Sequence, residues 1–284
     1  MTPPSSLDRY AVLGHPVAHS CSPFIHEQFA CQTGQALEYG RLLCPLDGFA
    51  EAARAFARSG AHGANVTVPF KLSARRLAEH ASERAVLAGA ANTLSFREDG
   101  WFADNTDGVG LVRDIEQNAG LPLARQQVLL VGAGGAGAGV LGPLIAALPA
   151  RVMVANRSQG KALALVQRHR AWADQHGVRL AACSLEDPGH DYGVVLNASA
   201  SSLQGQGSPV SAGVLAPGAL VLDLMYGPEA EPFLAWARAA NAHARDGLGM
   251  LVEQAAESFF IWRGVRPLTA PVLQALRLKL QVGE

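Results

Sequence analysis

The chain has 284 residues, of which 49% are hydrophobic and 17% are charged. That composition excludes a disordered chain, because it supplies enough apolar surface for the cores of one large domain or two ordinary ones. The formal net charge of -1 gives no basic excess for nucleic acid and no acidic tail.

Up to about residue 106, short apolar runs alternate with helical stretches. The runs that predict strands are 9–14, 37–44 and 63–68. Ser22 is expected to cap a helix that has Pro23 at its first position and ends near Cys31. Asp47 is expected to cap a second helix that runs through Ser59. Alternation of strands and helices predicts a largely parallel sheet covered by helices.

The alternation continues from about 107 to 247, and the last stretch, 248–284, reads as helical. The later strand candidates are 151–157, 192–199 and 219–226. Gly264 is expected to end the helix that begins near 248. The predicted fold class is therefore α/β.

The location is predicted from what the chain lacks. The four cysteines show no C-x-x-C spacing and are typical of reduced thiols. His15, His19 and His26 lie close in sequence, but no Cys or carboxylate completes a metal set, so no metal is predicted. The first residues have neither a basic nor an apolar signal region, and no apolar run is long enough to span a membrane. We expect a cytoplasmic protein.

A glycine motif provides the cofactor prediction. Gly132, Gly134 and Gly137 form G-x-G-x-x-G between a predicted strand and a predicted helix. The glycines permit a tight turn and let backbone N–H groups approach a pyrophosphate at the helix N-terminus. The alternative is a strand–helix turn that uses glycine for backbone reasons alone.

The residues after the next strand decide between NAD and NADP. An NAD site offers an acidic residue about 20 positions after the motif, to bind the ribose 2′-hydroxyl. This chain has Asn156, Arg157 and Ser158 there, with Lys161 shortly after. Two cations and a hydroxyl suit a 2′-phosphate, so the sequence predicts NADP. A solvated helix start with incidental charges is the alternative.

Lys71 stands out in composition. Of 23 basic residues, three are Lys and the others are Arg. Pro69 is expected in the first turn of a helix, where a cation opposes the helix dipole and the pKa of a lysine should fall. Lysine can transfer a proton and arginine cannot, so Lys71 is a candidate catalytic residue. An ordinary surface lysine is the alternative.

Asp107 lies in "DNTDG" (104–108) and has two readings. It could cap a helix over 108–118, because Asp is a good N-cap residue. It could also face a cleft between the two halves of the chain, where a carboxylate near Lys71 would orient its ammonium group and tune its pKa.

At this point the motifs, taken together, resemble the shikimate dehydrogenase family, from Tyr10 to Gly264. The matching stretches are "GHPVAHSCSP" (14–23), "NVTVPFK" (65–71), "GAANTL" (89–94), "DNTDG" (104–108), "GAGGA" (132–136), "NRS" (156–158) and "DGLGMLVEQAA" (246–256). The resemblance implies an N-terminal α/β substrate-binding domain, 1–106 with 248–284, and a Rossmann NADP-binding domain, 107–247, separated by a cleft. It implies hydride transfer between NADPH and the C3 carbonyl of 3-dehydroshikimate.

The resemblance also implies roles for individual residues. Lys71 and Asp107 would be the catalytic pair. The residues that would bind substrate are Ser20, Ser22, Thr67, Asn92, Tyr226 and Gln254. Those that would bind NADP are Gly132, Ala133, Gly134, Gly135, Ala136, Asn156, Arg157, Ser158, Lys161, Leu224 and Gly247. Short polar side chains suit a small hydroxylated carboxylate, because they can discriminate by hydrogen bonds.

Several of these residues have structural readings as well. Ser22 could only cap its helix, and Thr67 is at home in a strand. Asn92 could be a turn residue at a strand end, and Gln254 a polar position on an apolar helix.

The chain departs from the family pattern in three places. Cys21 stands between the two serines, where the family often has Lys or Arg, so positive charge near the carboxylate is reduced. Gly137 and Ala138 follow "GAGGA", where a basic or hydroxyl residue is usual. "NASASS" (197–202) replaces "NATSSG" near the cofactor.

Three functions therefore stay open at this point: a biosynthetic shikimate dehydrogenase, a quinate/shikimate dehydrogenase of the same fold, and a non-catalytic NADP-binding sensor. Ser22 and the absence of an acid after the second Rossmann strand disfavour the quinate and NAD enzymes. Lys71 together with Asp107 disfavours the sensor. The expected partner is a small-molecule substrate, and neither a nucleic acid nor a membrane; the oligomeric state is open, with a homodimer one option.

Overall fold

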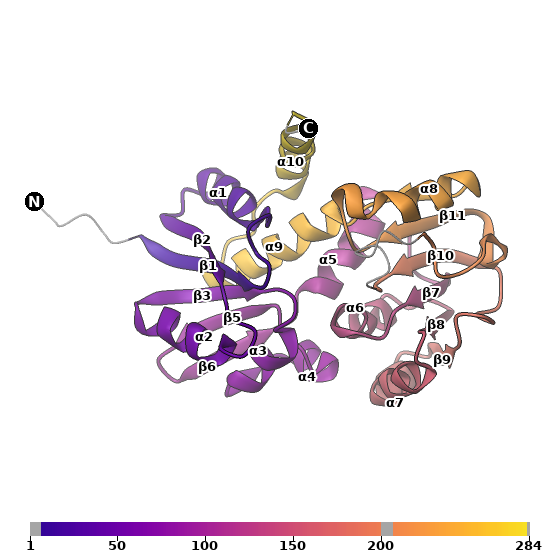
Figure 1. The fold of residues 1–284 in the computed structure, drawn as a ribbon, viewed down its shortest axis with the longest axis horizontal. Helices are drawn as coiled ribbons and strands as arrows, with labels where there is room; N and C mark the ends of the chain where they lie inside the picture. The colour runs from indigo at the N-terminus through magenta and orange to yellow at the C-terminus, as the bar shows by residue number, and fades with distance from the viewer. Residues whose placement is uncertain (1–6, 200–206, 283–284) are drawn as a thin grey trace, which may run out of the picture. The chain divides into compact units, whose positions relative to one another are not determined.

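The computed structural model describes residues 7–199 and 207–282. Within them the chain forms two compact units, Met1–Thr106 with Val252–Glu284 and Asp107–Leu251. Figure 1 follows the chain through both. Residues 200–202 of the "NASASS" stretch lie outside the described residues. Among the described helices none is long and apolar enough to cross a membrane.

The first unit is built on a six-stranded mixed sheet in the order β2-β1-β3-β5-β6-β4. Its strands are β1 (Asp8–Gly14), β2 (Leu37–Leu43), β3 (Ala61–Val66), β4 (His80–Ala81), β5 (Thr93–Arg97) and β6 (Gly100–Asp104). β1 runs parallel to β2 and β3, whereas β5 is antiparallel to β3 and β6. The three predicted strands are therefore confirmed, and β5 and β6 join them as a hairpin.

Helices cover both faces of this sheet. They are α1 (Ser22–Thr33), α2 (Phe49–Arg58), α3 (Lys71–Leu77), α4 (Glu83–Ala88), α9 (Leu248–Arg263, in this unit from Val252) and α10 (Thr269–Val282). Apolar side chains of α2 and α3 form a core with Ala11 and Leu13 of β1. On the other face Tyr10 stacks on Trp262 of α9, with the ring centroids 4.6 Å apart.

Three predicted helix starts differ from the structure. Cys21, not Ser22, is the N-cap of α1, so Ser22 begins the helix and does not cap it. Gly48, not Asp47, is the N-cap of α2. Phe70 is the N-cap of α3, so Pro69 precedes the helix and Lys71 is its first residue. Gly264 does end α9, with a φ of 70° that suits glycine.

The second unit has a fully parallel six-stranded sheet in the order β12-β11-β10-β7-β8-β9. Its strands are β7 (Gln127–Val131), β8 (Arg151–Ala155), β9 (Arg179–Cys183), β10 (Tyr192–Asn197), β11 (Leu215–Asp223) and β12 (His243–Arg245). Counted along the chain within the unit, this is the 3-2-1-4-5-6 order of a dinucleotide-binding sheet. The order reverses between β7 and β10, which makes that point the expected ligand site.

Helices pack on both faces of this second sheet as well. They are α5 (Asp107–Arg113), the π-helix η1 (Asp114–Asn118), α6 (Gly135–Ala146), α7 (Gln159–Gln175), η3 (Ala212–Val214), η4 (Gly227–Glu229) and α8 (Glu231–Ala239). Side chains of α5, α6 and α7 form one core with alternate residues of β7, β8 and β10. α8 closes the other face, where Phe233 is fully buried. Consecutive residues of β7 and β10 enter the two cores in turn, so these strands are buried on both faces, as is typical of a doubly covered parallel sheet.

Candidate functional site

In the first unit, polar residues collect at one edge of the sheet because the strand register brings them into a single row. Val12 of β1 lies beside Arg41 of β2 and Asn65 of β3. Asn65 lies beside Thr93 of β5, and Thr93 beside Asp104 of β6. The polar residues of this row lie near the ends of β2, β3 and β6 and at the start of β5. The row therefore lies along the side of the sheet where the loops after β2, β3 and β6 begin.

The two predicted carboxylate-binding serines lie at this edge and contact each other. Ser20 Oγ lies 3.2 Å from Ser22 Oγ and accepts the Ser22 backbone N–H at 3.3 Å. Tyr39 of β2 lies near Ser22, whose hydroxyl acts to lower the pKa of the phenol. Tyr39 in turn donates its phenolic proton to Asn65 Oδ1 at 2.7 Å. Burial raises the pKa of Tyr39 well above its ordinary value, so the phenol keeps the proton that it donates.

Asn92 is the centre of a second group of polar contacts. Its Nδ2 donates to Thr106 Oγ1 at 2.9 Å and to Gln254 Oε1 at 3.0 Å. Its Oδ1 accepts the backbone N–H of Thr106 at 2.8 Å and the hydroxyl of Thr93 at 2.9 Å. Each of these side chains is buried, and each hydrogen bond fixes the orientation of the Asn92 amide. Gln254 of α9 is therefore hydrogen-bonded to the residue that precedes β5.

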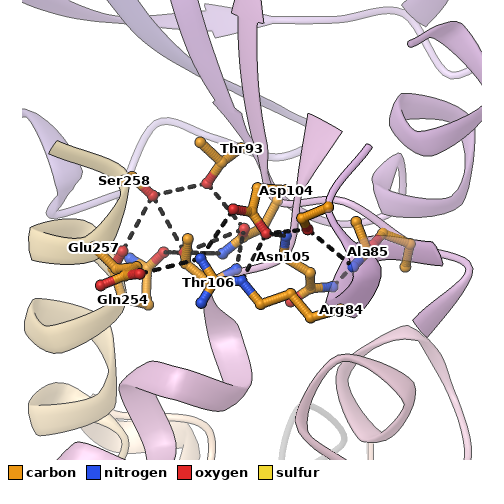
Figure 2. A network of polar contacts seen from close by, with 12 residues as sticks. Arg84, Ala85, Thr93, Asp104, Asn105, Thr106, Gln254, Glu257 and Ser258 are labelled. Carbon is orange, nitrogen blue, oxygen red and sulfur yellow. Dashed lines mark hydrogen bonds and ion pairs between the residues drawn. The ribbon is translucent and has the colours of Figure 1, made fainter. Parts of the chain in front are cut away.

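Figure 2 shows how helix α9 joins this group to the sheet. Ser258 Oγ lies 2.7 Å from Thr93 Oγ1 and 3.2 Å from Thr106 Oγ1. Asn65 Nδ2 donates to the same Ser258 hydroxyl at 3.0 Å. Because Ser258 is one helical turn after Gln254, both side chains point to the same side of α9. Asn65 thus links Tyr39, which lies near Ser22, to the group of contacts around Asn92.

Thr67 and Lys71 follow β3 on the same connection. The Thr67 N–H donates to Leu13 O at 2.9 Å, and its side chain lies against Gly14, where an added Cβ would be 2.3 Å from Thr67 Cγ2. Lys71 is half-buried at the first position of α3, and its carbonyl accepts the Ala91 N–H at 2.9 Å. The backbone of Lys71 is therefore tied to the loop that precedes Asn92.

Asp107 is the first residue of the second unit and is 4% exposed. It begins α5 and follows Thr106 directly in the chain. The π-helix η1 continues from α5 to Asn118, so the predicted helix over 108–118 exists with a change of helical type at Asp114. Within α5 a carboxylate in the first turn is favourable, because it faces the positive end of the helix dipole.

The glycine motif occupies the turn between β7 and α6 in the second unit. Gly132 has a φ of 110°, and Gly134 is the N-cap of α6. A Cβ added to Gly137 would lie 2.1 Å from Gly132 O, so no side chain fits this position. Gly137 departs from the family pattern, but the turn requires a glycine here, at the third glycine of the motif. Nothing lies within 4 Å of a Cβ added to Gly134 or Gly135, so the backbone there is open to a ligand.

The residues predicted to choose NADP lie after β8, beside the glycine turn. Asn156 Oδ1 accepts the Ala133 N–H at 3.1 Å and so connects the two loops. Arg157, Ser158 and Lys161 are exposed at the start of α7, and Ser158 is its N-cap without a capping hydrogen bond from its side chain. Two cations at this carboxyl edge of the sheet can reach an anionic group bound outside it.

Two further loops, which follow β11 and β12, contact each other at the carboxyl end of this sheet. Leu224 N donates to Asn197 O at 3.0 Å, and a Cβ added to Gly247 would lie 2.3 Å from Leu224 O. Leu224 and Gly247 are thus in close backbone contact, as two residues of one cofactor site would be. Tyr226, half-buried, also belongs to this unit, unlike the other predicted substrate ligands.

Several polar residues of these clusters were not predicted from the sequence. In the first unit they are Asn65, Tyr39, Thr106 and Ser258. In the second they are Asn197 and Asp223, which are fully buried and joined by a 3.0 Å hydrogen bond. Asn65 carried a usable signal, because it lies in the predicted strand, near the end of β3 and two residues before Thr67. The described residues contain no group of three or more His, Cys, Asp or Glu that could hold a metal ion.

A 3-2-1-4-5-6 parallel sheet with an open glycine turn, joined to a separate α/β unit rich in buried polar side chains, defines a two-unit dinucleotide-dependent dehydrogenase. Family models agree with this class. The shikimate dehydrogenase substrate binding domain matches residues 12–94, shikimate / quinate 5-dehydrogenase matches 114–202, and the shikimate 5′-dehydrogenase C-terminal domain matches 247–277. The chain belongs to the shikimate dehydrogenase family.

Individual proteins give the same result. A shikimate dehydrogenase (NADP(+)) of Methylibium petroleiphilum is 60% identical, over 96% of this chain and 95% of that protein. The crystal structure of an Ael1 enzyme from Pseudomonas putida is 45% identical with a TM-score of 0.86, over 95% of this chain and 98% of that one. A shikimate 5-dehydrogenase from Thermus thermophilus, in complex with NADP(H) and shikimate, is 32% identical with a TM-score of 0.83, over 95% and 99%.

Proposed function

We propose that the protein is an NADP-dependent shikimate dehydrogenase, which interconverts 3-dehydroshikimate and shikimate by hydride transfer at C3 in the synthesis of aromatic amino acids. The observation that carries this proposal is the 60% identity, over nearly the full length, to a relative named shikimate dehydrogenase (NADP(+)). The bound cofactor supplies or accepts the hydride. The protein binds and orients the substrate and moves the proton.

The choice of NADP is supported by the residues after β8. Arg157 and Lys161 are exposed beside the glycine turn, and no Asp or Glu takes the place where an NAD site has one. Backbone N–H groups at Gly134 and Gly135 would face the pyrophosphate, and the guanidinium of Arg157 would bind the 2′-phosphate. Ala133, Ala136, Asn156, Ser158, Leu224 and Gly247 would complete the cofactor contacts.

Substrate would bind to the first unit through the two linked polar clusters. Ser20 and Ser22 would bind the carboxylate, and Thr67, Asn92 and Gln254 would hydrogen-bond the ring hydroxyls. Because Asn92 and Gln254 are held by several hydrogen bonds each, their orientation is set before substrate binds. Tyr226 would line the site from the second unit. The first domain of the enzyme would be 1–106 with 248–284, and the NADP domain 107–247.

Lys71 and Asp107 would carry the proton chemistry. As hydride reaches the C3 carbon, its oxygen gains negative charge and needs a proton, which the Lys71 ammonium would donate. In the oxidative direction the same amine would accept it. Asp107 would bind a substrate hydroxyl and orient the lysine. We place the enzyme in the cytoplasm, where the reduced state suits its four free cysteines.

One assay tests the function. Purified protein is mixed with NADP and either shikimate or quinate, and NADPH formation is followed. We expect turnover with shikimate and far slower turnover with quinate. Comparable rates on both would favour the quinate/shikimate enzyme, and no turnover with either would leave only an NADP-binding protein.

A further inference from the structure

Arg41 on the edge strand β2 is joined to the loop that carries the two serines. Its Nε and Nη2 both donate to the backbone carbonyl of Ser20, at 3.1 and 2.6 Å. Two nitrogens of the guanidinium thus donate to the main chain of Ser20, a residue that we expect to bind the substrate carboxylate. A bidentate contact of this kind fixes the orientation of the planar group.

The strand register places Arg41 on the substrate side of the sheet. Arg41, Val12 and Asn65 lie in one row across β2, β1 and β3. Tyr39 is two residues before Arg41 on β2, so the two side chains leave the strand on the same face. That is the face on which Tyr39 contacts Asn65 and Ser22.

The positive charge of Arg41 acts on Tyr39, the neighbouring residue on this face of β2. Burial raises the pKa of Tyr39, and the positive charge of Arg41 acts in the opposite direction. A cation held against the Ser20 backbone also acts on an anion bound by Ser20 and Ser22. Arg41 is itself exposed and borders an open hollow of about 440 Å³, so solvent weakens its field without removing it.

The residue between the two serines supplies no such charge. Cys21 is half-buried, and its thiol lies 3.9 Å from His19 O. A neutral thiol neither attracts nor repels a carboxylate by Coulomb interaction. The arginine therefore provides a fixed positive charge at a loop whose own sequence offers two hydroxyls and a thiol.

We propose that Arg41 is a specificity-determining residue that favours an anionic substrate, by placing a positive charge beside Ser20 and Ser22. The inference rests on the proposed function, because it takes the substrate to be a carboxylate bound at these serines. It predicts that Arg41 contributes to substrate binding and not to the chemical step.

The test compares Arg41→Ala, Arg41→Lys and the double variant Cys21→Lys/Arg41→Ala with the wild type. Each is assayed with shikimate and with the methyl ester of shikimate, which lacks the negative charge. For Arg41→Ala we expect KM for shikimate to rise about 3- to 10-fold, as for one partly screened charge, with kcat nearly unchanged. The ester should show no such loss. Arg41→Lys and the double variant should recover most of the affinity, because each restores a cation.

Salt provides a second readout, because screening weakens a charge effect and leaves a purely structural one in place. Between 50 mM and 500 mM NaCl, KM for shikimate should rise more in the wild type than in Arg41→Ala. Arg58→Ala is the matched control, since Arg58 is also an exposed arginine of this unit and pairs with Glu51. Its KM for both substrates should equal that of the wild type.

Equal losses for shikimate and its ester, with no recovery in the double variant, would overturn the inference and leave Arg41 as a support for the Ser20 backbone. Equilibrium binding of shikimate, followed by calorimetry, separates this from the proposed function. A wild type that binds shikimate, but not its methyl ester, more tightly than Arg41→Ala does supports the inference even where turnover fails. A wild type that does not bind shikimate overturns both.

Discussion

Arg84 and Asp104 form a forked ion pair in the first unit, in which Nε and Nη2 of Arg84 donate to the two carboxylate oxygens at 2.7 and 2.9 Å. Arg84 also contacts Glu257 of α9 at 3.1 Å, so one guanidinium ties the end of β6 to the helix that carries Gln254. Burial alone would lower the pKa of Arg84, but Asp104 and Glu257 together raise it. The contacts are visible in Figure 2.

Removing one partner of this pair should destabilise the protein strongly. The Asp104 side chain is 7% exposed, so Arg84→Met leaves a buried carboxylate without its cation, at a cost of about 3 kcal/mol in the free energy of unfolding. Arg84→Met/Asp104→Leu should recover much of that loss, because no charge is then left unpaired. Urea unfolding measures both. Arg58→Met, which breaks an exposed pair, should cost far less. A small loss in Arg84→Met would show that water reaches Asp104.

Replacement of Lys71 should separate proton transfer from binding. We expect Lys71→Ala to lower kcat by about 10²-fold or more with little change in KM for shikimate, because a proton donor acts in the transition state. Lys71→Arg is the sharper variant, since it keeps the charge but cannot release a proton, and it should be nearly as inactive. Steady-state kinetics decide. A large rise in KM with kcat preserved would make Lys71 a binding residue.

Arg157→Ala should raise KM for NADPH and leave KM for NADH unchanged. Loss of a charge-assisted contact to the 2′-phosphate should raise KM for NADPH about tenfold or more. KM for NADH, which has no 2′-phosphate, should stay as it is. Arg170→Ala, an exposed arginine later in α7, is the control. An unchanged KM for NADPH in Arg157→Ala would mean that another group recognises the phosphate.

Gly137→Ala should disturb the cofactor turn. The added Cβ would lie 2.1 Å from the backbone oxygen of Gly132, so strand and helix must separate. We expect a loss of about 1–3 kcal/mol in stability and weaker NADP binding, measured by thermal unfolding with and without NADP. Gly160→Ala in α7 is the matched control, because nothing lies within 4 Å of its added Cβ. Wild-type NADP binding by Gly137→Ala would show that the turn can adjust.

His26 should make the first unit sensitive to acid. It is fully buried and stacked on Tyr39 at 4.2 Å, and burial lowers its pKa to about 3, against a smaller opposing effect of Asn65. The unfolded pKa is near 6.5, so only the unfolded chain binds this proton between pH 6.5 and about 3. The neutral His26 therefore costs no stability above pH 6.5. Between pH 6.5 and about 3, the free energy of unfolding falls by about 1.4 kcal/mol for each pH unit.

The measurement is the change in unfolding free energy between pH 7 and pH 5. In His26→Phe this change should be smaller than in the wild type by about 2 kcal/mol, because the group that takes up the proton is gone. His190→Gln, which alters an exposed histidine, should leave it as in the wild type. An equal pH dependence in His26→Phe would show that His26 is protonated in the folded protein.

Many strands of the fold could be predicted, because each is marked by a pattern within a short stretch of sequence. The strands β1, β2, β3, β7, β8 and β10 are short apolar runs, and a glycine turn follows β7. Helix starts were less predictable, since Gly48 and not Asp47 is the N-cap of α2. An N-cap depends on where the preceding loop leaves the backbone, and packing decides that.

The class of cofactor and the candidate catalytic groups follow from local patterns in the sequence. A Gly-x-Gly-x-x-Gly turn with Arg157 after the next strand is a local pattern, and Lys71 stands out wherever the chain folds. No such pattern shows that Arg41, Asn65 and Asp104 share one row of the sheet, or that Ser258 of α9 reaches Thr93; the folded structure is needed to see these contacts. Pairing between strands far apart in the chain follows from register and burial, which no single stretch of sequence contains.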